Sequence, residues 1–307
     1  MLGKDMNVTK NKRYRLTDLL DPGFMARLDG LDVLCRKILH GRLQGERRSK
    51  RRGQSVEFAD HRPYVAGDDL RFVDWNVYGR LDQLFLKLFL EEQDLSVHVA
   101  FDSSLSMSQP QASKYKFVKQ LSAALGYVSL VNNNRVTVSA FAERVTAQLT
   151  HMRGRTRVPA LAELLVTQDC DGPSLFDPAC QQLAASTPTS GIMMVVSDFF
   201  FKDGFESGLK RLIGRGHDLY VIQTLSPAEL NPSLSGDLRL VDIEDGDVAE
   251  ITVSKALVKY YKRNLTAYCN ELKAFCTRHG AAYVLASTDD SVEKLVLNYL
   301  RRIQLLR

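Results

Sequence analysis

The segment LSVHVAFDSSLSMS, residues 95–108, joins an apolar run to Asp102 and a group of serines that follows it. The apolar run is typical of a buried strand, and the segment 112–131 has the spacing of an amphipathic helix. Further along, GIMMVVSDF, residues 191–199, is continuously apolar, as expected for a central strand that is covered on both faces. This second run also leads to an aspartate, Asp198.

Strands and helices alternate through the rest of the chain. We expect strands at 135–142, 144–150, 218–225 and 281–287, and helices at 158–167, 177–185, 205–214 and 254–279. This alternation predicts a Rossmann-like, doubly wound α/β fold, in which helices cover both faces of a mostly parallel sheet. The short link near Glu143 predicts that the strand 144–150 is an antiparallel edge strand. Ligands of such sheets bind at the carboxyl ends of the strands, where Asp102 and Asp198 are expected.

The pattern divides the chain into three parts. Residues 94–307 form the α/β domain, with an inserted hairpin at 238–253, and residues 45–93 form a small β-rich leading segment. Residues 1–44 are expected to be an N-terminal tail and an amphipathic helix over 21–44. Asp21 and Pro22 suit the start of that helix, and its apolar stripe consists of Phe24, Leu28, Leu31, Cys35 and Ile38.

The composition is that of a soluble globular protein. Of the 307 residues, 45% are hydrophobic and 25% are charged, and the formal net charge is +5. The five cysteines include no C-x-x-C pair, which disfavours a disulfide framework or a zinc site and favours a reducing compartment. No apolar run approaches the roughly 20 residues of a membrane helix, and the polar, basic start is not a secretory signal. We therefore expect a cytoplasmic protein without direct membrane contact.

The two aspartates belong to a pattern of oxygen donors. Asp102, Ser104 and Ser106 form a D-x-S-x-S motif, in which alternate residues of an extended loop can converge on one point. Asp198 can lie beside them at the same edge of the sheet, and Ser174 adds a hydroxyl from the loop that begins at Asp171. Hard oxygen donors suit Mg²⁺, Mn²⁺ or Ca²⁺ and exclude soft metals. The motif alone is a weak signal, because a strand-end aspartate followed by serine is a common turn or helix cap.

Taken together, these residues resemble the metal-ion-dependent adhesion site of von Willebrand factor A domains. The resemblance implies an A-type fold and a divalent cation, Mg²⁺ or Mn²⁺, held by Asp102, Ser104, Ser106, Ser174 and Asp198. Two positions depart from that family. Its loop hydroxyl is usually a threonine after two glycines, where this chain has Gly172-Pro173-Ser174, and its last aspartate is often followed by glycine, where this chain has Phe199.

A longer segment resembles a narrower bacterial family, domain of unknown function 58. The similar residues are Glu57, Phe58, Arg62, Tyr64, Gly67, Asp68, Asp69, Arg71, Asp74 and Trp75, followed by DSSLSM at 102–107. The resemblance runs from about Gly45 to the C-terminus. It implies association with AAA+ ATPases of the MoxR type.

The favoured function is a metal-ion-dependent protein-interaction module, an adaptor or co-chaperone of a MoxR-type AAA+ ATPase. An acidic side chain of a client protein would complete the coordination of the cation. We expect no enzyme activity, because no P-loop, no G-x-S-x-G elbow and no evident general base is present. A metal-dependent hydrolase that uses the same cation is the first alternative.

Two charged segments leave other possibilities open. The basic run Arg47, Arg48, Lys50, Arg51 and Arg52 suggests nucleic-acid binding as a second alternative, which is disfavoured because no aromatic residues are interleaved. The other segment is either a surface that docks a partner or an internal network of ion pairs. Its members are Arg62, Asp68, Asp69, Arg71, Asp74 and Trp75.

Overall fold

A computed structural model describes residues 14–33, 57–90, 95–110, 112–187, 189–233, 236–241, 243, 246–303 and 305–306. The chain divides into two compact units. One unit combines residues 1–39 with 95–307, and the other is residues 40–94.

The larger unit is built on a six-stranded sheet with the strand order β10-β7-β6-β3-β4-β5. Five strands are parallel, and β5 is antiparallel to β4 at one edge, as the sequence predicts. The strands are β3 (Ser96–Asp102), β4 (Arg135–Phe141), β5 (Val145–Met152), β6 (Ile192–Ser197), β7 (Asp218–Leu225) and β10 (Ala282–Ser287). The predicted doubly wound α/β fold class is therefore confirmed.

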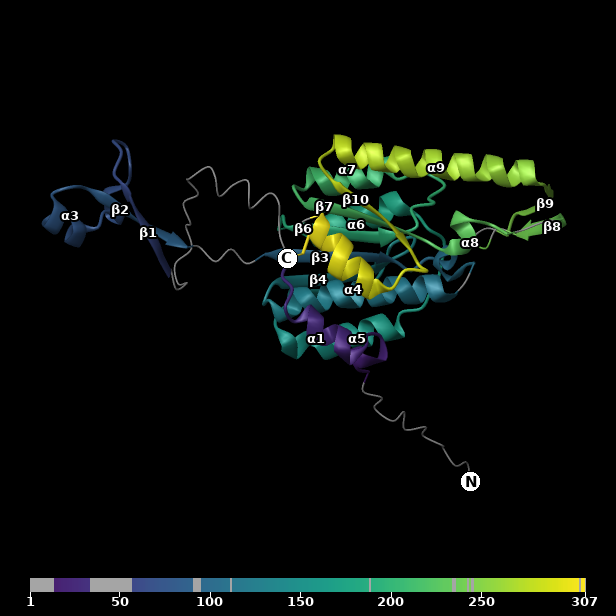
Figure 1. The fold of residues 1–307 in the computed structure, drawn as a ribbon, viewed down its shortest axis with the longest axis horizontal. Helices are drawn as coiled ribbons and strands as arrows, with labels where there is room; N and C mark the ends of the chain where they lie inside the picture. The colour runs from purple at the N-terminus through teal and green to yellow at the C-terminus, as the bar shows by residue number, and fades with distance from the viewer. Residues whose placement is uncertain are drawn as a thin grey trace, which may run out of the picture. The chain divides into compact units, whose positions relative to one another are not determined.

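Helices cover both faces of this sheet (Figure 1). One face packs against α1 (Pro22–Leu28), α4 (Ala112–Val131), α5 (Val158–Thr167), α10 (Val292–Lys294) and the π-type helix η5 (Leu295–Leu300). The other face packs against α6 (Phe176–Ser186), α7 (Glu206–Gly214) and α9 (Lys255–Arg278). The two hydrophobic cores explain why β3 and β6 are buried along their whole length.

Short elements connect the main layers. Single 3-10 turns form η1 (Leu16–Asp18), η3 (Leu105–Ser108) and η4 (Arg155–Arg157). The helix α8 (Pro227–Leu230) follows β7 and precedes a hairpin of β8 (Gly236–Val241) and β9 (Val248–Val253). The hairpin is antiparallel, with Leu240 opposite Ala249. It matches the hairpin that the sequence predicts at 238–253.

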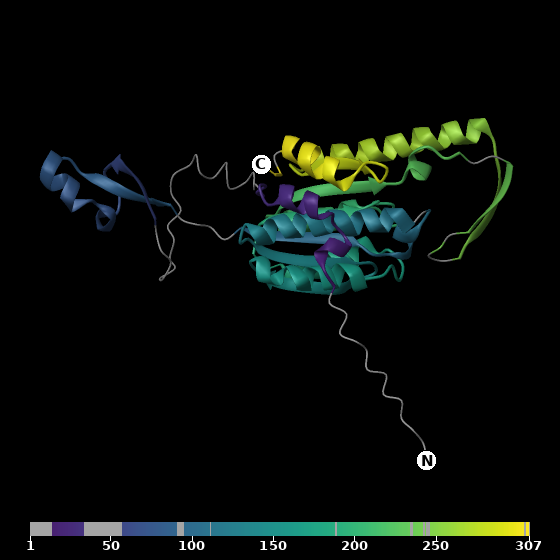
Figure 2. The same cartoon turned by 60° about the horizontal axis from the view of Figure 1, so that its bottom comes forward.

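The predicted helix over 21–44 is shorter than expected. Asp21 caps its start by accepting bonds from the backbone N–H groups of Gly23 and Phe24, but α1 ends at Leu28. Leu31 is buried beyond the helix, and Val33 pairs with Leu306 in an isolated β-bridge. The helical spacing misled at Leu31, which is buried as expected but lies after the end of the helix. Residues 34–44, with Cys35 and Ile38, lie outside the described residues. Figure 2 shows α1 beside α4.

The smaller unit contains a two-stranded antiparallel ribbon of β1 (Glu57–Pro63) and β2 (Phe85–Leu90). Between these strands lie η2 (Leu70–Phe72) and α3 (Trp75–Leu81). The strand β2 begins only at Phe85, because α3 runs to Leu81 and is followed by Asp82 with a positive φ of 51°. The basic run at 47–52 lies outside the described residues.

Among the described residues, no helix is both long enough and apolar enough to span a membrane. Four cysteines, Cys170, Cys180, Cys269 and Cys276, are free thiols.

Candidate metal centre

The strand order places the two predicted aspartates at the switch point of the sheet. The chain winds from β3 toward β4 on one side, and β6 pairs with the other side of β3. Because β3 and β6 are parallel, with Phe101 opposite Val196, their carboxyl ends lie at the same edge. Asp102 ends β3, and Asp198 directly follows β6. This edge is where doubly wound folds bind their ligands.

The Asp102 carboxylate is fully buried and accepts three hydrogen bonds. The backbone N–H and the Oγ of Ser104 donate to its Oδ1, at 2.9 and 2.7 Å. The Oγ of Ser197 donates to its Oδ2 at 2.7 Å. Burial raises the pKa of Asp102 above its ordinary value, and the charge of Asp198 raises it further, against the effect of these bonds. A cation would therefore stabilise the charged form of this carboxyl group.

The serines of the D-x-S-x-S motif converge as predicted. The Oγ atoms of Ser104 and Ser106 are 2.9 Å apart. Ser104 is buried, and Ser106 is half-buried. When the Ser104 hydroxyl donates its hydrogen bond to Asp102, the lone pairs of its oxygen remain available for an electropositive group. Asp102, Ser104 and Ser106 thus form one continuous cluster of oxygen donors.

Asp198 faces the same edge but is held by its own partners. Its Oδ1 accepts a bond from the backbone N–H of Phe200 at 2.9 Å, and its main-chain oxygen accepts one from Gln223 at 2.9 Å. Its Oδ2 lies 2.7 Å from the Nζ atom of Lys114. The side chain of Asp198 is nearly inaccessible to solvent, at 5%.

Lys114 is a component of the site that the sequence analysis missed. Its side chain is 1% exposed, and its Nζ bridges Asp198 and the Oε1 of Glu229, each at 2.7 Å. Burial alone would lower the pKa of Lys114, but the charges of Asp198 and Glu229 raise it above its ordinary value. The sequence did contain a signal for its burial. Lys114 lies seven residues, or about two helical turns, before Leu121 and so shares the buried face of α4.

The loop hydroxyl predicted at Ser174 belongs to a segment that is attached to the motif. The backbone N–H of Asp171 donates to the carbonyl of Ser103 at 2.9 Å, and that of Leu105 donates to the carbonyl of Gly172 at 3.1 Å. Gly172 has a φ of +74°, a conformation that favours glycine. The two backbone bonds therefore hold the loop that contains Ser174 alongside the motif. Ser174 itself is half-buried.

Phe199 explains the departure from glycine after the last aspartate. Its φ is +62°, the left-handed region in which a bulky residue is strained. Packing compensates, because the ring is fully buried and lies 5.8 Å from the ring of Phe176 and 5.7 Å from that of Phe201. The backbone is also anchored, since the Phe199 N–H donates to the Oγ of Ser197 at 2.9 Å.

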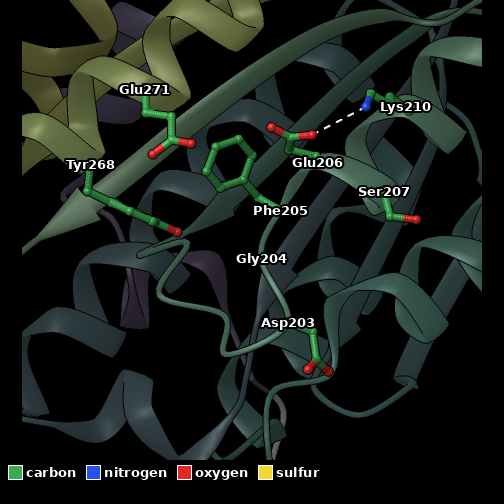
Figure 3. A pocket seen from close by; sticks show the side chains of 8 residues that line it. All are labelled: Asp203, Gly204, Phe205, Glu206, Ser207, Lys210, Tyr268 and Glu271. Atoms are coloured by element: carbon green, nitrogen blue, oxygen red, sulfur yellow. Dashed lines mark hydrogen bonds and ion pairs between the residues drawn. The ribbon is translucent and has the colours of Figure 1, made fainter.

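A second anchor reaches this loop from α9. The Tyr268 hydroxyl donates a hydrogen bond to the carbonyl oxygen of Phe199. Figure 3 shows Tyr268 extending toward the loop that leads to Phe205. Both residues line an open hollow of about 500 Å³. Glu206 and Lys210 at the hollow are paired at 3.3 Å. Packing on one side of the sheet thus positions the backbone that carries Asp198.

These residues suit a hard cation better than a soft one. The described part of the chain holds no group of three or more histidine, cysteine, aspartate and glutamate side chains placed to bind a metal ion. The candidate donors are instead two carboxylates and neighbouring hydroxyls, which are ligands for Mg²⁺ or Mn²⁺. Two carboxylates, those of Asp198 and Glu229, contact the ammonium of Lys114, and the charge of Asp198 also acts on the buried carboxyl group of Asp102. The donor set therefore fits a divalent cation.

The residues proposed from sequence for partner binding all lie in the smaller unit. Arg62 pairs with both carboxylate oxygens of Asp68 at 2.8 and 2.7 Å, and Arg71 pairs with Asp69 at 2.6 Å. These bonds hold the turn between β1 and η2.

Asp74 and Trp75 open the helix α3. Asp74 caps it through the N–H groups of Asn76 and Val77 and accepts a bond from His61 at 2.9 Å. The His61 bond is the main reason that the pKa of Asp74 is lowered to about 2. The charged residues of this segment thus bond within the unit. Trp75, in contrast, is 60% exposed.

The fold and the site together define a doubly wound α/β domain with an acidic, hydroxyl-rich cluster at its switch point. The family described as "Protein of unknown function DUF58" matches residues 60–271, and the chain belongs to this family.

Several relatives and solved structures are similar to this chain. Uncharacterized proteins of Mycobacterium bovis and Mycobacterium tuberculosis are each 24% identical over 278 residues, which is 89% of this chain and 87% of theirs. A conserved hypothetical protein BatB from Bacteroides thetaiotaomicron is 16% identical, with a TM-score of 0.42, over 68% of this chain and 98% of that one. A von Willebrand factor type A protein from Catenulispora acidiphila is 15% identical, with a TM-score of 0.35, over 46% of this chain and 35% of that one.

Proposed function

We propose that this protein is a metal-ion-dependent protein-interaction module. Its divalent cation, Mg²⁺ or Mn²⁺, would be held by Asp102, Ser104, Ser106, Ser174 and Asp198. The observation that carries the proposal is the convergence of Asp102, Ser104 and Ser106 beside Asp198 at the switch point.

The chemistry of the donors favours binding over turnover. Mg²⁺ takes about six oxygen ligands and readily keeps water among them. Serine hydroxyls are neutral, so the cation would stay electropositive on its open side. A carboxylate from another protein is the natural ligand there, and its affinity would depend on the metal.

The partner that we propose is a MoxR-type AAA+ ATPase, as the family resemblance implies, together with a client that supplies the acidic side chain. The ATPase would provide the energy from nucleotide hydrolysis, and this chain would provide the metal-dependent contact. The carboxyl group of Glu229 is already paired with Lys114 and with the backbone N–H of Ser226. It is therefore poorly placed to act as a general base in a hydrolase.

Calorimetric titration of Mg²⁺ and of Mn²⁺ tests the site. Wild-type protein should bind one ion, whereas Asp102→Ala and the near-isosteric Asp102→Asn should bind none. Asp203→Ala is a matched control, because Asp203 is an exposed acid on the loop that follows Asp198. Equal binding by the Asp102 variants would refute the proposed site.

Capture of the ATPase tests the interaction. Binding of a purified MoxR-type ATPase should be lost in EDTA and in Asp102→Asn, while circular dichroism shows that the variant is folded. Capture that is indifferent to both changes would contradict a metal-dependent contact. Metal-dependent turnover of a phosphoester or peptide that requires Asp198 would favour the hydrolase instead.

A further inference from the structure

Lys114 provides a positive charge inside the candidate metal centre. Its ammonium lies 2.7 Å from the Oδ2 atom of Asp198, one of the proposed ligands, and the lysine side chain is 1% exposed. An amino group in this position neutralises part of the charge that would otherwise attract a metal ion.

Glu229 holds the ammonium in place from the opposite side. Its Oε1 lies 2.7 Å from Lys114, and its Oε2 accepts a bond from the backbone N–H of Ser226 at 2.7 Å. Ser226 in turn caps α8 by accepting a bond from the N–H of Glu229 at 3.2 Å. The hydroxyl of Tyr261 on α9 donates to the Glu229 carbonyl at 3.0 Å. Glu229 is therefore a fixed anchor, and its position does not depend on Asp198.

We propose that the Lys114 ammonium competes with the divalent cation for Asp198 and so sets the affinity of the site. The inference rests on the proposed function and concerns how the same site is regulated. With Lys114 in place, the positive charge beside Asp198 makes the metal bind weakly and reversibly. Glu229 moderates this effect, because its carboxylate shares the ammonium with Asp198 and adds a negative charge beside the site.

The competition predicts opposite effects for two substitutions. Lys114→Met removes the ammonium but keeps an unbranched side chain of similar length, so Asp198 is left open to the metal. Glu229→Gln removes the second partner, so the ammonium is held by Asp198 alone and the site loses one negative charge. We expect Mg²⁺ and Mn²⁺ to bind at least about tenfold more tightly to the first variant and about tenfold more weakly to the second.

Lys116→Met is the control for a general change in charge. Lys116 lies on the same helix and is exposed, so solvent and salt screen its charge from the site. Its substitution should change the affinity by less than about twofold. Circular dichroism, with and without Mg²⁺ at about 10 mM, reports whether each variant is folded.

Calorimetric titration of MgCl₂ and MnCl₂ into the full chain decides the matter. Tighter binding by Lys114→Met than by wild type and Lys116→Met supports the competition, even if wild type binds too weakly to measure. Equal or weaker binding by Lys114→Met overturns it. If Lys114→Met does not fold, the Glu229→Gln variant decides, and unchanged or tighter binding by that variant overturns the proposal. Loss of the proposed function looks different: neither wild type nor Lys114→Met would bind metal, or Asp102→Asn would bind it as well as wild type.

Discussion

The central strand β3 carries a buried histidine that should make folding stability depend on pH. His98 lies four residues before Asp102 on this strand, opposite Thr137 of β4 and Met193 of β6. It is 6% exposed, and its ring centre lies 5.2 Å from that of His217. Burial, with a further contribution from His217, lowers the pKa of His98 from 6.5 to about 4.

The sign of the effect follows from where the proton binds. Above pH 6.5 His98 is neutral in both the folded and the unfolded chain, so the full stability is present. Between pH 6.5 and about 4 the unfolded chain takes up a proton that the folded chain refuses, so stability falls. Each pH unit between the two pKa values is worth about 1.4 kcal/mol. The whole interval from 6.5 to about 4 therefore gives a loss of about 3 kcal/mol.

His98→Leu replaces the titrating ring by an apolar side chain of similar size. Urea unfolding, followed by far-ultraviolet circular dichroism, gives the free energy of unfolding of both proteins at pH 7 and pH 4. The stability of the variant relative to wild type should increase by about 3 kcal/mol from pH 7 to pH 4. Titrating groups that do not interact with His98 contribute equally to both proteins and cancel. A difference that stays constant across this range would refute the reasoning, because His98 would then titrate alike in both states.

Two further substitutions test the packing of each unit. Gly191→Ala should lower the free energy of unfolding by about 3 kcal/mol, because an added Cβ would lie 2.1 Å from the carbonyl oxygen of Ser96, whereas no heavy atom lies within 4 Å of a Cβ at Gly214. Denaturant unfolding that ranks Gly191→Ala and Gly214→Ala as equally stable would be inconsistent with this close approach. Asp74→Ala removes the cap of α3, so the fluorescence of Trp75, the single tryptophan, should change at a lower denaturant concentration, while the circular dichroism transition of the larger unit stays in place. Coincident shifts of both signals would show that the two units do not unfold separately.

Local patterns in the sequence predicted the α/β elements well. The apolar runs that end at Asp102 and Asp198 became neighbouring central strands, because continuous apolar strands are stable only when both faces are covered. The helix expected over 21–44 was wrong for residues 29–33, where Leu31 is buried outside the helix and Val33 forms a bridge with Leu306. Periodicity reports which residues are buried more reliably than it reports the conformation that buries them.

The candidate site shows a similar division. The D-x-S-x-S spacing predicted that Asp102, Ser104 and Ser106 converge, because alternate residues of a loop can face one point. The ion pair between Lys114 and Glu229 was not predicted, because the two residues lie 115 residues apart in the sequence. The charged segment around Arg62 left two readings open, and its side chains are bonded within their own unit.

Local periodicity and short links were enough to predict the order of the strands and helices along the chain, the antiparallel edge and the positions of the two aspartates. Tertiary structure alone decided that the ammonium of Lys114 lies between Asp198 and Glu229, and that packed rings hold Phe199 at a positive φ. The physical reason is that the charge balance of a buried site depends on long-range contacts, whereas spacing along the chain records only which residues are near one another in sequence.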